Sequence, residues 1–257
     1  MHNAIVTIIK IYCKEMAKPV IYIICHNDET EHAARQIPFG TPIRISGSNN
    51  LFESQVFELI DKRQEEWINA PWVGIVTHSF KRKIGDIDIP GLLGKYEGTD
   101  IDVVSLFNLD FVKPRVNRPV PFFESVAFQM GASCWTAIIT MLRILSYRDE
   151  EIMNPKIQGF FSNYWIARPI WMRRYIDFFK KCKKITDTHP TVKECMKADG
   201  YYGGQNPASP AKLTEIFGRP IYEMTPFLFE RLPCFFFGME GAKLARDGIT
   251  IDWQLLD

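Results

Sequence analysis

The sequence predicts an α/β protein with a mostly parallel sheet flanked by helices in one large domain. Residues 20–25 form a continuous apolar run, which is typical of a strand buried on both faces of a parallel sheet. Segments with strand and helix patterns alternate along the first half of the chain. The chain has 257 residues, of which 46% are hydrophobic, and this approaches the upper size for a single hydrophobic core. We therefore expect one domain.

The individual elements follow from local patterns. We expect the apolar segments 20–25, 72–80 and 102–107 to be neighbouring strands of the sheet. A loop rich in glycine and proline, which includes Pro90 and Gly94, separates the last two. The other predicted elements are a strand over residues 41–46, a strand-like segment over 161–167, helices over 51–63, 134–145, 170–182 and 210–217, and an aromatic segment over 227–237.

These patterns divide the chain into four parts. Residues 1–18 precede the first confident strand and are expected to be an N-terminal extension. Residues 19–120 form the strand-rich half of the domain, and residues 121–237 form its helix-rich half. The mixed character of residues 238–257 predicts a peripheral tail.

Composition excludes several classes of protein. There are 31 Lys and Arg residues against 30 Asp and Glu residues, and a net charge of +1 argues against a nucleic-acid partner. The six cysteines include no CxxC pair, so we expect free thiols, a reducing cytoplasmic location and no structural metal site. We expect no signal peptide, because the apolar run 4–9 lacks a preceding basic region and stops at Lys10. We also expect no transmembrane segment, because the uncharged residues 125–142 carry several polar side chains.

Two carboxylates stand at the start of the strand predicted over residues 102–107. Asp100 and Asp102 are two residues apart, so in extended backbone they share a face and can bind one divalent cation. In enzymes that use nucleotide-diphosphate sugars, such a pair holds a metal that neutralises the leaving group. A second pair, Asp86 and Asp88, shows that the spacing also arises in solvated loops. Both interpretations of Asp100 and Asp102 stay open.

Polar residues follow two of the predicted strands. His26 and Asp28 come directly after the first strand, and His78, Lys81 and Arg82 end or follow the strand over 72–80. Ligands of open α/β sheets bind outside the carboxyl ends of the strands, so these residues are candidates for binding an anionic ligand such as a diphosphate. The alternative is a solvated basic turn.

An adjacent acid and base interrupt the aromatic segment near the C-terminus. Glu230 and Arg231 lie among Phe227, Phe229 and Leu232. Burying such charges is costly unless they are paired or functional, so the two residues form either a buried ion pair or part of a site.

Three segments together resemble glycosyltransferase-like proteins of large DNA viruses, and they are similar to bacterial capsular-polysaccharide glycosyltransferases. The resemblance covers residues 19–237 and is sharpest at the last segment. The segments are Gly-Ile-Val-Thr-His-Ser at 74–79, Asn-Tyr-Trp-Ile-Ala-Arg-Pro at 163–169, and Phe-Leu-Phe-Glu-Arg-Leu at 227–232.

The resemblance implies a GT-A-type, Rossmann-like fold and transfer of a sugar from a nucleotide-diphosphate donor to a hydroxyl of a glycan or glycoprotein acceptor. Residues 19–120 would then bind the nucleotide sugar, and residues 121–237 the acceptor. It further implies Glu230 as the base that activates the acceptor, Asn163 and Trp165 on the acceptor side, Arg231 at the substrate, and Mn²⁺ or Mg²⁺ as cofactor. A viral protein of this kind would act in the host cytoplasm. Because Lys81 and Arg82 follow His78, two cations could replace the metal.

Two other functions remain open from the sequence. The segment around Cys134 resembles the nucleophile region of papain-like cysteine peptidases. The only histidine downstream of it is His189, and a thiol without a well-placed base is inert, so core packing of Cys134 is the stronger interpretation. The third possibility is an inactive α/β scaffold whose aromatic residues bind a carbohydrate or a protein.

Overall fold

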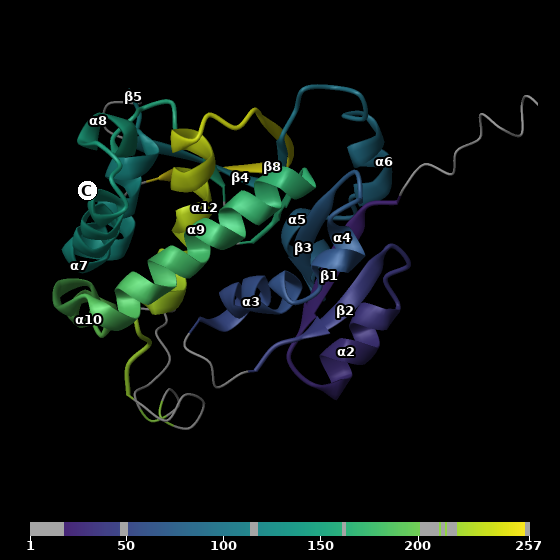
Figure 1. Ribbon diagram of the computed structural model, residues 1–257, viewed down its shortest axis with the longest axis horizontal. Helices are drawn as coiled ribbons and strands as arrows, with labels where there is room; N and C mark the ends of the chain where they lie inside the picture. Colours follow the sequence, from purple (N-terminus) through teal and green to yellow (C-terminus); the bar gives the residue numbers. More distant parts are fainter. Residues whose placement is uncertain are drawn as a thin grey trace, which may run out of the picture.

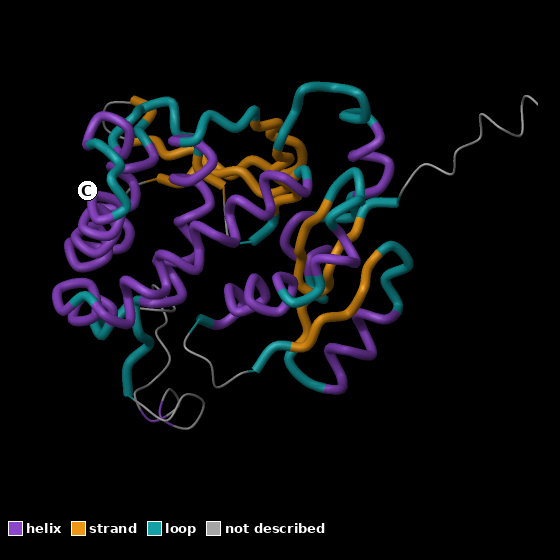
Figure 2. Tube along the Cα trace, viewed as in Figure 1, coloured by secondary structure: helices purple, strands orange, loops and turns teal. Residues whose placement is uncertain are grey.

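The described part of the chain forms an eight-stranded sheet with helices on both faces (Figures 1 and 2). The computed structural model describes residues 18–46, 51–113, 118–160, 163–200, 211, 214 and 220–254. The strands are β1 (Val20–Cys25), β2 (Gly40–Arg44), β3 (Val73–Thr77), β4 (Val103–Lys113), β5 (Arg118–Pro119), β6 (Gly159–Phe160), β7 (Trp165–Ala167) and β8 (Leu244–Gln254).

The strand order is β2-β1-β3-β7-β4-β5, and β6 and β8 also pair with β4. β1 is parallel to β2 and β3, and β4 is parallel to β8. The short strand β7 lies between β3 and β4 and is antiparallel to both, because Ala167 pairs with Val73 and with Val103. The strands predicted over 72–80 and 102–107 therefore run in the same direction but are not direct neighbours, which corrects the expectation. The inserted strand comes from residues about sixty positions further along the chain, a pairing that local patterns do not reveal.

Helices cover both faces of the sheet, as the sequence predicts. Helices α2, α5 and α6 pack on one face, and α3, α7, α9 and α12 pack on the other. Figure 1 shows α9 running diagonally across the middle of the molecule, with α3 packed beside it. The helices are α2 (Asp28–Arg35), the 3₁₀-helix η1 (Phe52–Gln55), α3 (Val56–Asp61), α4 (Gln64–Trp67), α5 (Phe80–Ile84), α6 (Ile89–Gly94), α7 (Phe122–Ile144), α8 (Asp149–Ile152), α9 (Pro169–Thr188), α10 (Pro190–Met196) and α12 (Thr225–Met239).

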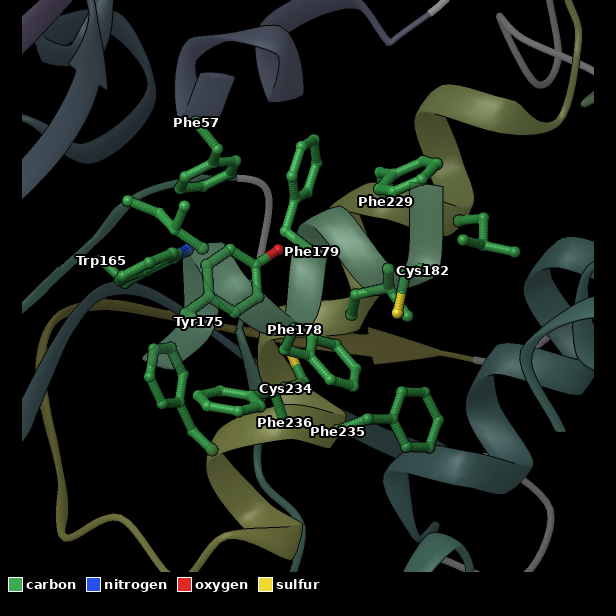
Figure 3. Packing of buried hydrophobic residues seen from close by; sticks show 14 of the residues in the cluster. Phe57, Trp165, Tyr175, Phe178, Phe179, Cys182, Phe229, Cys234, Phe235 and Phe236 are labelled. Atoms are coloured by element: carbon green, nitrogen blue, oxygen red, sulfur yellow. The ribbon is translucent and has the colours of Figure 1, made fainter. Parts of the chain in front are cut away.

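The core consists of two apolar layers that the sheet separates. Alternate residues of β1 point to opposite faces, so Ile21 and Ile23 join the layer under α2, α5 and α6, while Tyr22 and Ile24 join the other layer. The layer under α9 and α12 is rich in aromatic rings that contact one another, many of them edge to face (Figure 3). Both halves of the chain contribute to this layer, so they share one core.

The C-terminal part differs from its prediction. Residues 238–257 were expected to be a peripheral tail, but Leu244–Gln254 forms β8 and pairs along the whole length of β4. The pattern of β8 is mixed because Arg246 and Asp247 interrupt it, and this hides a strand that completes the sheet.

Other predictions are partly met. The helix predicted over 170–182 lies within α9, and the one over 134–145 lies within α7, which is kinked at Gly131 (φ 73°, ψ 174°). Part of the segment 161–167 forms β7. Residues 1–17 and nearly all of 210–217 lie outside the described residues. None of the helices that the structure describes combines the length and hydrophobicity needed to cross a bilayer.

Candidate functional site

The carboxyl ends of β1 and β3 bring two predicted residues together. Ile24 pairs with Thr77, so His26 and His78 follow their strands at the same edge of the sheet. The His78 N–H donates to the carbonyl of Ile24 at 3.0 Å, and the two imidazole rings are 6.0 Å apart in an edge-to-face arrangement. Burial, and secondarily the charge of His78, lower the pKa of His26. We call this side of the sheet the carboxyl edge.

The start of β7 adds a tyrosine to the carboxyl edge. Because β7 is antiparallel to β3, Tyr164, which precedes it, lies beside the end of β3. Its hydroxyl is 2.6 Å from Oγ1 of Thr77, and its ring lies 5.1 Å from Nζ of Lys83 on α5. Burial raises the pKa of Tyr164, so the phenol stays neutral. The tyrosine thus holds the Lys83 ammonium at this edge by a cation–π contact.

Glu230 lies near the start of α12, which packs against η1. Its Oε2 is 3.7 Å from Nη1 of Arg231, and only 20% of its side chain is exposed. Burial raises the pKa of Glu230 to about 7; Arg231 and Lys83 oppose this rise, and Glu53 adds to it. A carboxyl with a pKa near neutrality is suited to accept a proton during a reaction.

Glu53 is a second acid in the same environment. Burial raises its pKa, and Lys83 acts in the opposite direction. Burial lowers the pKa of Lys83 itself, but the neighbouring Tyr164, Glu53 and Glu230 outweigh that effect, so the ammonium stays charged. Glu53, Lys83 and Glu230 therefore act on one another electrostatically, and Arg231 acts on Glu230; we call these four residues the acid–base cluster.

The backbone before Glu53 is strained. Phe52 has φ 47°, a left-handed conformation that is uncommon for a residue with a side chain. The ring of Phe52 lies 5.1 Å from the ring of Tyr222, just before α12, and this packing compensates for the strain. Strained backbone that is held by its surroundings is typical of functional sites.

Asn163 offers unsatisfied hydrogen-bonding groups at the carboxyl edge. It is 2% exposed, and within the described chain neither its amide nitrogen nor its amide oxygen has a partner. Nδ1 of His78 is also buried and has no hydrogen-bond partner within the described chain. Because buried polar atoms in proteins are nearly always hydrogen-bonded, both groups are available to a ligand or to ordered water.

Trp165 does not line this edge, in contrast to the role that the resemblance implies. Its side chain is fully buried in the aromatic layer, where it stacks on Phe57 at 5.7 Å and meets Tyr175 edge to face at 5.1 Å (Figure 3). It sits on β7, whereas Asn163 lies in the turn before that strand. Trp165 is therefore part of the core.

Three predicted residues lie in the exposed segments that follow the strands. Asp28 is the first residue of α2 and pairs with Arg44 at 2.5 Å. Lys81 on α5 pairs with Asp86 at 2.6 Å. Arg82 is exposed on the same helix. All three come after carboxyl ends of strands, but their side chains are accessible to solvent, unlike those of the acid–base cluster.

Asp100 and Asp102 lie at the opposite edge of the sheet. They precede β4, whose first residue is level with the first residue of β3, so they are remote from His26 and His78. The ammonium of Lys243 pairs with Asp100, and Oδ2 of Asp102 accepts the Lys243 N–H at 2.8 Å. Each carboxylate therefore already contacts Lys243, and both lie at the amino ends of the strands, far from a ligand bound at the carboxyl edge.

Two surface hollows in the described part of the chain are not lined by any predicted site residue. Across the described ranges there is no group of three or more His, Cys, Asp or Glu side chains arranged to hold a metal. One hollow of about 260 Å³ lies between α9 and the end of α12, beside Arg174 and Glu240. Another, of about 200 Å³, lies beside Trp72 and Pro90, at the side of the sheet where β3 begins; we call this side the amino edge.

Cys134 does not have the properties of a nucleophile. It is fully buried in α7, and burial raises its pKa to about 12, so the thiol stays protonated at neutral pH. The structure thus favours the core interpretation over the peptidase.

Sequence reasoning missed three residues of the site. The patterns predict Glu53 in an amphipathic helix over 51–63, Lys83 in a basic turn, and Tyr164 in the strand-like segment over 161–167. One signal was present: Lys83, like Arg82, follows a strand at its carboxyl end. Nothing local marked Glu53.

Comparison with known proteins supports the fold. The chain is similar to the apo structure of the bifunctional glycosyltransferase WbbM, with a TM-score of 0.54 and 12% identity. The match covers 91% of this chain and 45% of the WbbM chain, so this chain spans less than half of that protein. No family model and no curated protein sequence matches the chain. The single α/β domain, with helices on both faces of its sheet, thus shares its fold with part of a glycosyltransferase.

Proposed function

We propose that the protein transfers a sugar from a nucleotide-diphosphate donor to a hydroxyl group of a glycan or glycoprotein. The observation that carries this proposal is Glu230, a mostly buried carboxyl with a pKa of about 7, in a fold similar to that of a glycosyltransferase. The surrounding cations and unsatisfied amide groups at the carboxyl edge supply the binding groups that such a reaction needs.

Glu230 acts as general base in this proposal. The acceptor oxygen forms a bond to the anomeric carbon of the donor sugar, while the bond from that carbon to the phosphate oxygen breaks. The acceptor proton passes to Glu230, and the nucleoside diphosphate leaves with the bonding electrons. At neutral pH a group with a pKa of about 7 is partly ionised and can accept this proton.

The donor diphosphate would bind along the carboxyl edge. Lys81 and Arg82 follow β3 and bring positive charge to the leaving group, with His26 and His78 beside them. Arginine suits a diphosphate because its guanidinium donates two parallel hydrogen bonds. The exposed carboxylate of Asp28 can accept hydrogen bonds from donor hydroxyl groups. Because these cations can neutralise the leaving group, the proposed reaction assigns no step to Mn²⁺ or Mg²⁺.

The acceptor would lie beside Asn163 and Arg231. Asn163 has one donor group and one acceptor group free within the described chain, which matches a sugar hydroxyl that both donates and accepts. Arg231 is almost completely buried beside Glu230, where it holds the base in place. Sugars are neutral, so this side needs hydrogen-bonding groups more than charge.

The test uses purified protein with a panel of nucleotide sugars and oligosaccharide acceptors. One panel donor should stabilise the protein to heat and yield a glycosylated product. E230Q keeps the shape of the side chain but cannot accept a proton. We expect its kcat to fall about 100-fold or more while donor-induced stabilisation is retained.

E150Q is the matched control, since Glu150 is exposed on α8 and should leave kcat unchanged. Normal turnover by E230Q would refute the assignment of the base. Absence of both donor binding and transfer across the panel would instead favour an inactive binding scaffold.

A further inference from the structure

Three hydroxyl groups form a hydrogen-bonded row at the carboxyl edge. Oγ1 of Thr77 lies 2.6 Å from the hydroxyl of Tyr164 and 3.3 Å from Oγ of Ser79. Each hydroxyl group carries one proton, and the two bonds of the row use two of the three protons. No other acceptor for these hydroxyl groups is found among the described residues. One O–H group therefore remains free to donate to a ligand, whichever way the two bonds run.

Lys83 places a positive charge against this row. Its Nζ lies 5.1 Å from the centre of the Tyr164 ring, which is anchored to Thr77 by the hydrogen bond of its hydroxyl. In the described part of the chain no carboxylate forms an ion pair with Lys83. Glu53 and Glu230 act on it only from farther away, and burial raises the pKa of both acids, so they carry less negative charge at neutral pH. The ammonium therefore lacks a close anionic partner.

The row and the ammonium lie where sheets of this type bind ligands. Thr77 is the last residue of β3, Ser79 precedes α5, and Lys83 lies on α5. Nδ1 of His78, between Thr77 and Ser79 in the sequence, is buried and has no hydrogen-bond partner in the described chain. Lys83 is only half-buried, so a ligand can reach it. An ammonium and an O–H donor beyond the carboxyl end of a strand suit the oxygen atoms of a phosphate group.

We propose that Lys83 binds the diphosphate of the nucleotide-sugar donor and that Tyr164 is the residue that positions it. This inference rests on the proposed transfer reaction and names a further residue of its donor site. Lys81, on the same helix, is already paired with Asp86 at 2.6 Å, whereas Lys83 has no such competitor among the described residues. When the bond from the anomeric carbon to the phosphate oxygen breaks, the Lys83 ammonium stabilises the negative charge that the diphosphate gains. The free O–H group of the row donates to a second oxygen of the same phosphate.

The binding test uses inorganic pyrophosphate as the probe and calorimetry as the measurement. K83M removes the charge and keeps much of the side-chain volume. It should weaken pyrophosphate binding about 10-fold or more, which is the scale of a lost hydrogen bond to a charged group. K95M is the matched control, because Lys95 is exposed at the end of α6 and its loss should leave the affinity unchanged.

Two variants of Tyr164 test its positioning role. Y164F keeps the ring beside Lys83 and loses only the hydroxyl group, whereas Y164L loses the aromatic face as well. Y164L should therefore weaken pyrophosphate binding about 5-fold more than Y164F does, because the cation–π contact is lost. Thermal unfolding checks that each variant is folded. Equal affinities of Y164L and Y164F would overturn the positioning role.

Unchanged pyrophosphate affinity in K83M would overturn the proposal, as would absence of binding by the wild-type protein. If K83M does not fold, K83Q decides in the same way. Binding of glucuronate that depends on Lys83, without binding of pyrophosphate, would instead assign the site to the carboxylate of an acidic sugar and overturn the diphosphate.

The failure of this proposal can be told apart from the failure of the proposed function, because the binding measurement needs no transfer. Pyrophosphate binding that depends on Lys83, without transfer to any acceptor, would refute the proposed function and leave the anion site in place. Equal transfer by the wild-type protein and K83M, with equal pyrophosphate affinity, would retain the proposed function and reject the role of Lys83.

Discussion

Glu230 should destabilise the folded protein at neutral and alkaline pH. Its pKa rises from 4.5 to about 7 on folding because burial disfavours the charged carboxylate. Below pH 4.5 the group is protonated in both the folded and unfolded states, so it has no effect. As the pH rises from 4.5 to 7, the unfolded state loses its proton first and is favoured. At about 1.4 kcal/mol per pKa unit, the full penalty above pH 7 is about 3 kcal/mol.

E230Q should remove this penalty because a neutral amide does not ionise. We expect the free energy of unfolding of E230Q to exceed that of the wild-type protein by up to about 3 kcal/mol at pH 8. At pH 4.5 and below, the difference between the two proteins should be small and constant. The measurement is urea-induced unfolding of both proteins, monitored by tryptophan fluorescence, at one-unit intervals from pH 4 to 8.

The change of this difference with pH is the decisive quantity. A constant offset would reflect altered packing or hydrogen bonding of the amide and not the buried charge. If the difference stays constant between pH 4.5 and 8, or if E230Q becomes relatively less stable as the pH rises, then Glu230 is not held with a raised pKa. Such a result would also remove the main support for its role as a base.

Two further predictions concern residues outside the cluster. Asp102 contacts the Lys243 backbone at the amino edge. D102N should therefore leave nucleotide-sugar affinity and its response to Mn²⁺ unchanged in calorimetry. A loss of affinity would place the acid pair at the donor site instead. The buried hydroxyl of Tyr175 has no partner in the described chain, so Y175F should be neutral or stabilising by up to about 1 kcal/mol in urea unfolding. Y22F, which loses a 2.8 Å hydrogen bond to Glu66, should instead cost about 1 kcal/mol; a larger loss in Y175F than in Y22F would contradict this assignment.

The strands and the edge where they end could be predicted because both depend on local sequence. The apolar run of β1 and the histidine directly after it together span only seven residues, and those of β3 span no more. Strand order could not be predicted in the same way. β7 contains only Trp165–Ala167, and its position between β3 and β4 depends on pairing across long stretches of chain. Likewise, α6 contains Pro90 and two glycines and resembles a loop, although Asp88 caps its first turn.

The placement of the acid pair illustrates the difference between a motif and its position. Asp100 and Asp102 precede their strand, whereas His26 and His78 follow theirs. Strands that run in the same direction must place these two groups at opposite edges of the sheet. Because the acids precede their strand and the histidines follow theirs, the sequence order itself argues against one diphosphate site formed by both groups. The metal-binding spacing of the two acids suggested such a site but says nothing about which end of the strand they occupy.

Aromatic residues present the opposite difficulty, since their chemistry suits a binding site and a core equally well. Trp165 and Asn163 belong to the same conspicuous segment, but one is packed in the aromatic layer while the other has unsatisfied polar atoms at the carboxyl edge. Alternation does not separate them, because residues two apart in extended backbone share a face. Trp165 lies on β7, whereas Asn163 lies in the turn before it, level with the carboxyl end of β3.

The pair Glu230 and Arg231 shows why geometry was needed to assign a role. Burial and a neighbouring guanidinium change the pKa of a carboxyl in opposite directions, and sequence alone does not say which effect is larger. In the structure Nη1 of Arg231 and Oε2 of Glu230 are 3.7 Å apart. A charge-assisted hydrogen bond between such atoms is shorter, at about 2.7–2.9 Å. The guanidinium therefore gives only part of its stabilisation to the carboxylate, and burial dominates, which raises the pKa of Glu230 to about 7. A closer pair would have fixed the charge on Glu230 and made it a structural residue; at this separation the carboxyl can still exchange a proton at neutral pH.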